Sequence, residues 1–315
     1  VLSTMAGFLQ DQFVGTAPDA QYYLFRTEDV FSENPVEESY WVEAAERADS
    51  LGVDIINTSL GYKSYDNPNY SYSNEDMNGN TAFITRSANI ASEKGILLVN
   101  SAGNSGSNGV NAPADSPEVF SIGAVDENGD YASFSSQGNA FQPTLKPDVV
   151  ARGAQSFVIN GNGTMVQNNG TSFSSPILAG AAASLWQVFP EMTNSQIKDF
   201  IRQSASQYAT PDFFLGYGIP DFQIALEIGL EVQASQRTEF KVFPNPVTDH
   251  FEIIFPGQLE QARMLIFDIL GQLVYDTTIF DDQAEINIEN LAGGLYLLRI
   301  EGANSTSKTF KLIKR

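Results

Sequence analysis

Two short runs of apolar residues, each preceded by a helical pattern that ends at a glycine, restrict the fold of the first half of this chain. The segment 39–52 has apolar residues at helical spacing, and the run VDIINTS (53–59) follows it. The segment 81–95 repeats this arrangement and leads into ILLVN (96–100). Buried strands that alternate with helices are typical of a parallel sheet with helices on both faces, so the sequence predicts an α/β domain.

Further elements continue this pattern toward the middle of the chain. The segment 119–136 is interpreted as two strands joined by a turn, and 175–189 as a helix rich in small residues that ends before a proline. Thr193 and Gln196 have the spacing of a capping box, which predicts that a helix begins at their position and covers 194–205.

The character of the sequence changes at about residue 233. Short alternating runs separated by Gly, Asn, Asp and Pro follow, at 250–255, 263–269, 272–279, 284–288 and 295–300. Closely spaced strands of this kind are typical of a small all-β sandwich. We therefore predict two domains, one over 1–232 and one over 238–315.

Charge and composition exclude several classes of function. Residues 1–236 hold nine basic and 27 acidic residues, for a formal charge of −18, and the remainder carries −3. Such a surface repels phosphate backbones and anionic lipids, so no nucleic-acid partner is expected. There is no cysteine, hence no disulfide or thiolate site, and no apolar run is long enough for a transmembrane segment.

Three loops are expected at the carboxyl ends of the parallel strands, where ligands bind in open α/β sheets. They are SLGY (59–62), NSAGNSG (100–106) and the loop ahead of GTSFSSP (170–176). The last places Ser172 among small residues directly ahead of a predicted helix. A serine hydroxyl is a weak nucleophile that needs an adjacent base, most often His, and this chain has one histidine, His250.

Residues 1–230 resemble the subtilisin-like serine proteases, because these three blocks occur in the order typical of that family. Three supporting blocks also match: SIGAVDENGDYASFSSQG (121–138), KPDVVARG (146–153) and GYGIPDFQIAL (216–226). The resemblance implies a subtilisin-like fold, incomplete at its N-terminus, and hydrolysis of a polypeptide substrate.

The resemblance also implies roles for single residues. Ser172 would be the nucleophile, and Asn104 would hold the oxyanion together with the Ser172 backbone N–H. The substrate would lie against two stretches, Ser59, Leu60, Gly61 and Ser101, Ala102, Gly103, with Leu60 and Ala102 making the specificity pocket apolar. Without the resemblance, Ser172 could be a helix-capping serine, Asn104 a turn residue, and both stretches ordinary loops.

The general base and its orienting Asp are expected upstream of Val1. In this family the base lies in a block HGTxV, and VLSTMAGFL (1–9) matches the helix that follows, which places the base four residues before Val1. His250 lies at a strand start in the β-rich tail, so we do not expect it to replace the base. A related family of serine proteases has Asp at the position of Asn104. The Asn in this chain therefore favours the family that uses Ser, His and Asp. Because the catalytic His and its orienting Asp are expected upstream of Val1, the 315 residues alone are expected to be inactive. The alternative function is an inactive surface or binding module.

No cofactor is required for this chemistry, and no metal ligand is assigned. The segment 6–20 is too short for the calcium loop of many relatives, although structural calcium elsewhere stays open. The insert 62–80, rich in Tyr, Asn and Asp, could bind calcium or cover the cleft, but an ordinary surface loop is the favoured interpretation.

Residues 240–315 resemble the C-terminal sorting domain that directs proteins through the type IX secretion system. Four blocks carry the resemblance: FKVFPNPVTDHFEI, MLIFDILGQLVYD, LAGGLYLLRI and the terminal KLIKR. It implies a secreted or surface-attached protein with the secretion machinery as a partner. The alternative is a β-sandwich that binds carbohydrate or packs on the protease.

Overall fold

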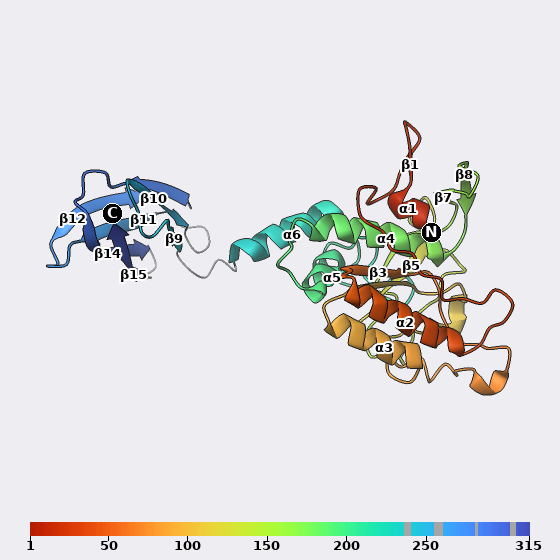
Figure 1. The fold of residues 1–315 in the computed structure, drawn as a ribbon. Helices are drawn as coiled ribbons and strands as arrows, with labels where there is room; N and C mark the ends of the chain where they lie inside the picture. The colour runs from red at the N-terminus through yellow and green to blue at the C-terminus, as the bar shows by residue number, and fades with distance from the viewer. Residues whose placement is uncertain (236–240, 255–260, 281–282, 303–306) are drawn as a thin grey trace. The chain divides into compact units, whose positions relative to one another are not determined.

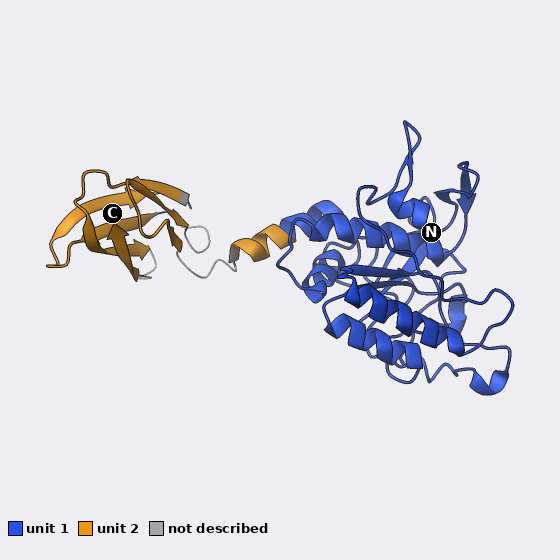
Figure 2. Ribbon diagram, in the orientation of Figure 1, with its two compact units in different colours: residues 1–228 blue, residues 229–315 orange. Residues whose placement is uncertain are grey.

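The chain folds into two compact units, residues 1–228 and 229–315, which Figure 2 shows in different colours. The computed structural model describes residues 1–235, 241–254, 261–280, 283–302 and 307–315. The division falls inside helix α6 (Phe222–Ser235). Two sequence predictions, the domain start at residue 238 and the strand end at Phe255, lie outside the described residues.

The central sheet of unit 1 has four parallel strands in the order β3-β4-β5-β6. They are β3 (Ile55–Thr58), β4 (Leu97–Ser101), β5 (Phe120–Val125) and β6 (Val149–Arg152). Helices α2 (Val36–Ser50) and α3 (Phe83–Glu93) lie on one side of this sheet, and α4 (Thr171–Trp186) lies on the other (Figure 1). The predicted parallel sheet with helices on both faces is therefore confirmed.

The apolar spacing of the sequence explains how α2 and α3 pack. Each helix buries residues at positions i, i+4 and i+7, which lie on one face: Trp41, Ala45 and Ala48 in α2, and Ile84, Ala88 and Ala91 in α3. Except for Ala48, these side chains share one hydrophobic cluster with Leu98 of β4. The small alanines allow the two helices to approach each other and the sheet closely.

The remaining elements of unit 1 surround this core. They are α1 (Leu2–Ala6), β1 (Phe8–Leu9), β2 (Phe13–Val14), η1 (Pro68–Tyr70), η2 (Gly106–Asn108), β7 (Ser156–Ile159), β8 (Met165–Asn168) and α5 (Asn194–Gln203). The predicted capping box of α5 is present, because the Thr193 side chain accepts from the Gln196 N–H and the Gln196 side chain accepts from the Thr193 N–H. β1 and β2, and β7 and β8, form small antiparallel pairs.

The structure differs from the sequence prediction over 119–136. β5 is present, but the second strand is reduced to a single bridge between Val125 and Tyr131. The Asp126 carboxylate accepts from the N–H groups of Asn128 and Asp130 and closes a tight turn. The chain then leaves the sheet through a second turn, in which the Ser135 N–H donates to the Ala132 carbonyl.

The insert 62–80 is held by the core rather than lying free on the surface. Tyr62 and Met77 are each 1% exposed, Tyr65 is 6% exposed, and all three belong to the cluster that includes Trp41. The favoured interpretation of an ordinary surface loop missed this burial, because the aromatic residues of the insert have no regular spacing.

Unit 2 contains two antiparallel sheets, in the orders β13-β10-β9 and β12-β11-β14-β15. Their strands are β9 (Lys241–Phe243), β10 (His250–Ile254), β11 (Ala262–Phe267), β12 (Leu273–Ile279), β13 (Gln283–Asn287), β14 (Gly294–Gly302) and β15 (Ser307–Lys314). Phe251 and Ile253 of the first sheet and Met264, Leu298 and Leu312 of the second belong to one buried cluster. Apolar residues thus alternate inward from both sheets, as in the predicted β-sandwich.

Candidate active site

The candidate site lies where β3 and β4 end and α4 begins. Thr58 pairs with Asn100 in the parallel register of β3 and β4, so the loops after both strands start at the same level of the sheet. α4 packs against both strands. The three sequence-predicted loops therefore meet at one edge of the sheet, as expected for the carboxyl ends of parallel strands.

Ser172 is the second residue of α4 and is half-buried. The helix begins at Thr171, four residues earlier than predicted, so Ser172 lies inside its first turn rather than ahead of it. Gly170 enters the helix with φ 147°, a backbone conformation that L side chains rarely adopt. The predicted helix starts at 175, directly before Pro176. In the structure Pro176 is the sixth residue of α4, so the helix lacks the hydrogen bond that an N–H at this position would donate to the carbonyl of residue 172.

Two reciprocal hydrogen bonds join Ser172 to Ser59. The Ser59 Oγ donates to the Ser172 carbonyl at 3.1 Å, and the Ser172 Oγ donates to the Ser59 carbonyl at 3.4 Å. Asn57 extends this contact, because its Nδ2 donates to the Ser59 Oγ while its Oδ1 accepts from the Ser175 Oγ. The end of β3 and the first turn of α4 are thus held together by side chains.

Asn104 reaches the same helix from the loop after β4. Its Oδ1 accepts from the Thr171 backbone N–H at 2.9 Å and from the Thr171 Oγ1 at 3.1 Å. Because a carboxamide is planar, this orientation turns its Nδ2 away from Thr171. Within the described residues, neither the Asn104 Nδ2 nor the Ser172 N–H donates to any acceptor. Two donors are therefore left at the start of α4.

The loop that carries Asn104 requires Gly103. Its φ is +111°, and a Cβ at this position would lie 2.7 Å from the Ser136 Oγ. The Gly103 N–H donates to the Thr171 Oγ1 at 3.3 Å. The backbone therefore approaches the start of α4 more closely than another residue would allow.

The two predicted substrate-binding stretches are joined by Asn100, at the end of β4. Asn100 is 1% exposed, and its Nδ2 donates to the Leu60 carbonyl at 3.2 Å and to the Ser101 carbonyl at 2.8 Å. Ser101 and Ala102 are buried, and Leu60 is half-buried. The structure thus brings the stretches 59–61 and 101–103 together.

Asn111 is a site residue that the sequence prediction missed. A Cβ on Gly61 would lie 2.9 Å from the Asn111 Cβ, and a Cβ on Gly103 would lie 3.6 Å from the Asn111 Cγ, so Asn111 stands between the two stretches. Its buried Oδ1 has no hydrogen-bond partner in the described part of the chain. Asn111 follows no strand in the sequence pattern, and only its contacts in three dimensions reveal it.

A polar cavity of about 470 Å³ adjoins these residues. Its lining includes Gly61, Ser105 and Asn111 together with Lys63 of the insert. The Lys63 Nζ donates to the Asn74 Oδ1 and to the Asn108 carbonyl, and burial lowers its pKa. The expected apolar pocket is therefore bordered by a polar wall.

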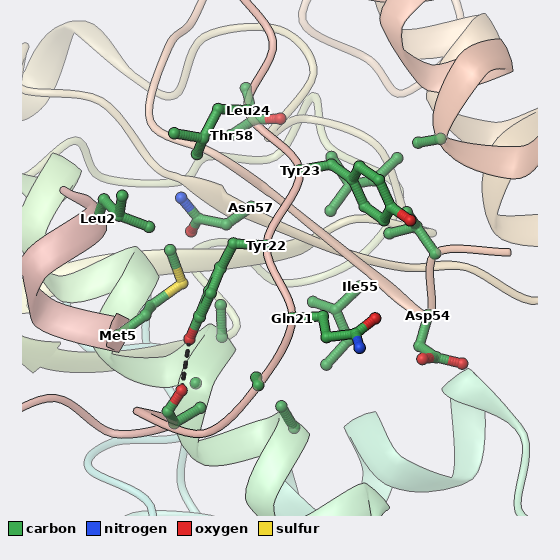
Figure 3. Close-up of a pocket in the computed structure, with 18 of the residues that line it drawn as sticks. Leu2, Met5, Gln21, Tyr22, Tyr23, Leu24, Asp54, Ile55, Asn57 and Thr58 are labelled. Carbon is green, nitrogen blue, oxygen red and sulfur yellow. Dashed lines mark hydrogen bonds between the residues drawn. The ribbon is translucent and has the colours of Figure 1, made fainter. Parts of the chain in front are cut away.

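A second, larger cavity of about 950 Å³ follows the edge strand β3 and reaches Ser59 and Leu60. Figure 3 shows its lining, with Tyr22, Tyr23 and Leu24 crossing over β3 and the Tyr22 hydroxyl donating to the Ala17 carbonyl. Ser172 and Asn104 are not among the residues that line it. The size of a cavity therefore does not identify the site in this chain.

His250 lies in unit 2, at the start of β10. It is exposed, and its Nε2 lies 3.7 Å from the Glu285 Oε1 on the neighbouring strand β13. This is an ordinary surface contact within the β-sandwich, in keeping with the sequence interpretation of a polar residue at a strand start.

Comparison with known families gives two matches. Residues 2–218 match the Subtilase family, and residues 241–315 match the Secretion system C-terminal sorting domain. Subtilisin E of Bacillus subtilis is 33% identical over 218 residues, which cover 68% of this chain and 51% of subtilisin E. The chain thus spans about half the length of this curated relative.

Two solved structures illustrate the similarity in fold. The self-cleaved protease domain of PatA has a TM-score of 0.60 at 24% identity, covering 73% of this chain and 81% of that domain. MycP1 from Mycobacterium smegmatis has a TM-score of 0.57 at 23% identity, covering 71% of this chain and 68% of MycP1. Among the described residues, no helix is long and apolar enough to cross a membrane.

Proposed function

We propose that this chain, which belongs to the subtilase family, forms part of a secreted serine endopeptidase in which Ser172 attacks the peptide bond. Its C-terminal sorting domain identifies it as a protein that is secreted or attached to the cell surface. One observation supports the assignment of Ser172. The Asn104 side chain binds Thr171, the residue before Ser172, while within the described residues the Asn104 Nδ2 and the Ser172 N–H donate to no acceptor.

In the proposed reaction, the Ser172 Oγ forms a bond to the carbonyl carbon of the substrate as its proton passes to a general base. The negative charge that develops on the carbonyl oxygen is held by the Asn104 Nδ2 and the Ser172 N–H, with support from the positive end of the α4 dipole. The C–N bond of the substrate then breaks, and the leaving amine takes the proton from the base. Water hydrolyses the acyl-enzyme by the same steps and releases Ser172.

The general base and its carboxylate partner are proposed to come from residues that precede Val1 in the natural protein. The printed sequence holds one histidine, His250, and it lies on the surface of unit 2. The 315 residues alone are therefore expected to turn over substrate very slowly, since loss of the base from subtilisin, a relative, costs about 10⁶-fold in turnover.

The substrate is proposed to be an extended polypeptide that lies between the stretches 59–61 and 101–103. Leu60, which is half-buried, supplies an apolar contact, whereas Ala102 is 0% exposed and has no free surface for a substrate. The Asn111 Oδ1, which has no hydrogen-bond partner among the described residues, supplies an acceptor. A buried acceptor without a partner disfavours a purely apolar side chain, because its lost hydration is not replaced. We therefore propose that the pocket prefers a substrate side chain that donates a hydrogen bond.

The second partner is the secretion machinery that recognises the sorting domain. The match over 241–315 and the two-sheet architecture of unit 2 support this proposal.

Cleavage of an unfolded protein substrate by the secreted natural protein tests the proposed activity. We expect cleavage by the natural protein and at least 10⁴-fold less by its Ser172→Ala variant. The sequence before Val1 separates the two candidate functions at low cost. An Asp at a strand end followed by an HGT block supports the peptidase, whereas other residues there indicate an inactive binding module.

A further inference from the structure

Three carboxylates converge ahead of helix α2, away from the residues assigned to the proposed reaction. Glu28 and Glu33 lie in the loop that leads into α2, and Glu37 is the second residue of that helix. Ligand oxygens of the three side chains all lie within 4.8 Å of one another. At neutral pH this arrangement brings three negative charges together, which costs free energy unless a cation lies between them.

Glu37 provides a second and independent observation. It is 1% exposed, and although its Oε1 accepts from the Asp29 N–H at 2.7 Å, its buried Oε2 has no hydrogen-bond partner among the residues that the structure describes. The adjacent Glu38 is equally buried but fully satisfied, since it accepts from the hydroxyls of Tyr65 and Tyr72 and from the Ile84 N–H. A buried carboxylate oxygen without a partner is costly, so the contrast indicates that Glu37 meets a ligand that Glu38 does not need.

Among the described residues, no Lys or Arg forms an ion pair with Glu28, Glu33 or Glu37.

We propose that Glu28, Glu33 and Glu37 bind one calcium ion. The donors are all oxygens, and neither His nor Cys lies in the group, so the site suits a hard cation rather than zinc or copper. Calcium takes six to eight oxygens in flexible geometry, and the exposed side of Glu33 leaves room for water to complete its shell. Extracellular calcium modules bind with dissociation constants of about 10⁻⁴ to 10⁻³ M, the range expected here.

The position of the site connects it to the substrate-binding edge. The Tyr62 hydroxyl donates to the Glu28 Oε1, and Tyr62 directly follows Gly61 of the stretch 59–61. On the other side, the Asp66 N–H donates to the Glu33 carbonyl at 3.0 Å, and the Glu33 N–H donates to the Asp66 Oδ2 at 3.1 Å. A bound calcium ion would thus link the loop ahead of α2 to the insert 62–80. It would also restrict the motion of the adjacent stretch 59–61, along which the substrate is proposed to lie.

Calcium titration of the 315-residue chain tests this site without any need for peptidase activity. After removal of metal by a chelator, calorimetry is expected to count one more calcium ion bound to the unmodified chain than to Glu33→Gln. Glu43→Gln is the matched control, because Glu43 is an exposed residue of α2 outside the group. Glu33 is itself exposed, so its substitution leaves folding intact, and Glu37→Gln provides the second, buried variant.

Thermal unfolding provides the second readout. Both tryptophans, Trp41 and Trp186, lie in unit 1, so their fluorescence follows that unit alone. Calcium at 100 times its dissociation constant is expected to raise the unfolding temperature of the unmodified chain and of Glu43→Gln by about 5–10 °C, and that of Glu33→Gln by less than 2 °C. Equal calcium binding by Glu33→Gln and the unmodified chain overturns the proposal, and so does equal stabilisation by magnesium.

Discussion

The Ser59 Oγ donates a hydrogen bond to the Ser172 carbonyl at 3.1 Å, and Pro176 is the reason that this carbonyl is available. In an uninterrupted helix the N–H of residue 176 would occupy the carbonyl of residue 172, but proline has no N–H. The first turn of α4 therefore exchanges a hydrogen bond within the helix for one to the end of β3. A helix interruption thereby becomes a means of positioning the proposed nucleophile.

This relationship predicts that substitutions of Ser59 and Pro176 are coupled. Ser59→Ala removes the only side-chain donor found for the Ser172 carbonyl in the described residues and should lower the stability of unit 1 by about 1 kcal/mol. In a Pro176→Ala background the new N–H can take over that carbonyl, so the cost of Ser59→Ala should become smaller. Urea unfolding followed by tryptophan fluorescence measures the four variants of this cycle, and strictly additive costs would contradict the account.

Substitutions of Asn104 separate its two contacts. Asn104→Asp keeps an oxygen acceptor for the Thr171 N–H and places a negative charge at the start of α4, so unit 1 should remain as stable as before. It loses the amide donor, and turnover by the natural protein should fall by at least the 10²–10³-fold known for loss of this kind of donor in subtilisin, a relative. Asn104→Ala should lower both stability and turnover. Peptide hydrolysis combined with urea unfolding distinguishes the two variants. Full turnover by Asn104→Asp would contradict the proposed role of the Asn104 amide as an oxyanion donor.

Asn111→Ala should change which peptides are cleaved rather than how the bond is broken. Loss of the buried acceptor should reduce kcat/KM for substrates whose side chain donates a hydrogen bond to the pocket, by about tenfold, and should spare apolar ones. A library of peptides that vary at the residue before the cleaved bond measures this preference. An unchanged preference would remove Asn111 from the pocket.

The buried Asp148 predicts a specific response to acid. Its carboxylate binds the Lys146 Nζ at 2.9 Å and the Arg202 Nη2 at 2.6 Å, and although burial opposes ionisation, these two cations hold its pKa below the usual value. Because the folded pKa is lower than the unfolded one, of about 4, the contribution of Asp148 is fully present above that pH. It is lost as the pH falls further, through the folded pKa.

Asp148→Asn should therefore destabilise unit 1 by about 3–5 kcal/mol at neutral pH, because it leaves buried cations without their partner. The variant should also lose part of the decline in stability below pH 4. Asp49→Asn, at an exposed ion pair with Lys94, is the control and should cost less than about 1 kcal/mol. Urea unfolding between pH 7 and pH 3 measures both effects, and an equal cost for the two variants would exclude a special role for Asp148.

Local sequence patterns were enough to predict the sheet and its covering helices. The i, i+4, i+7 spacing of Trp41, Ala45 and Ala48 and the uninterrupted apolar run at 96–99 reflect burial directly, so their elements appear nearly where expected. The start of α4 was misplaced because Pro176 normally marks a helix beginning. Only the contact of the freed carbonyl with Ser59 explains why the helix extends further back.

The site was predictable only in part. Sequence patterns placed Asn104 after a strand and Ser172 close to a helix start, and the resemblance to the subtilisin-like proteases then selected these two residues. Asn111 and Glu37 could not, because their significance comes from a buried oxygen without a partner, which depends on neighbours far apart in the sequence. Spacing along the chain carries no information about such an unmet hydrogen bond.

Labelling of the secreted natural protein with a fluorophosphonate tests the central claim most directly, because this reagent modifies only a serine whose hydroxyl has been activated as a nucleophile. We predict that mass spectrometry will find the label on Ser172 and that Ser172→Ala will remain unlabelled. A natural protein that folds and is secreted but takes up no label at Ser172, or that is labelled equally well after Ser172→Ala, would contradict the account.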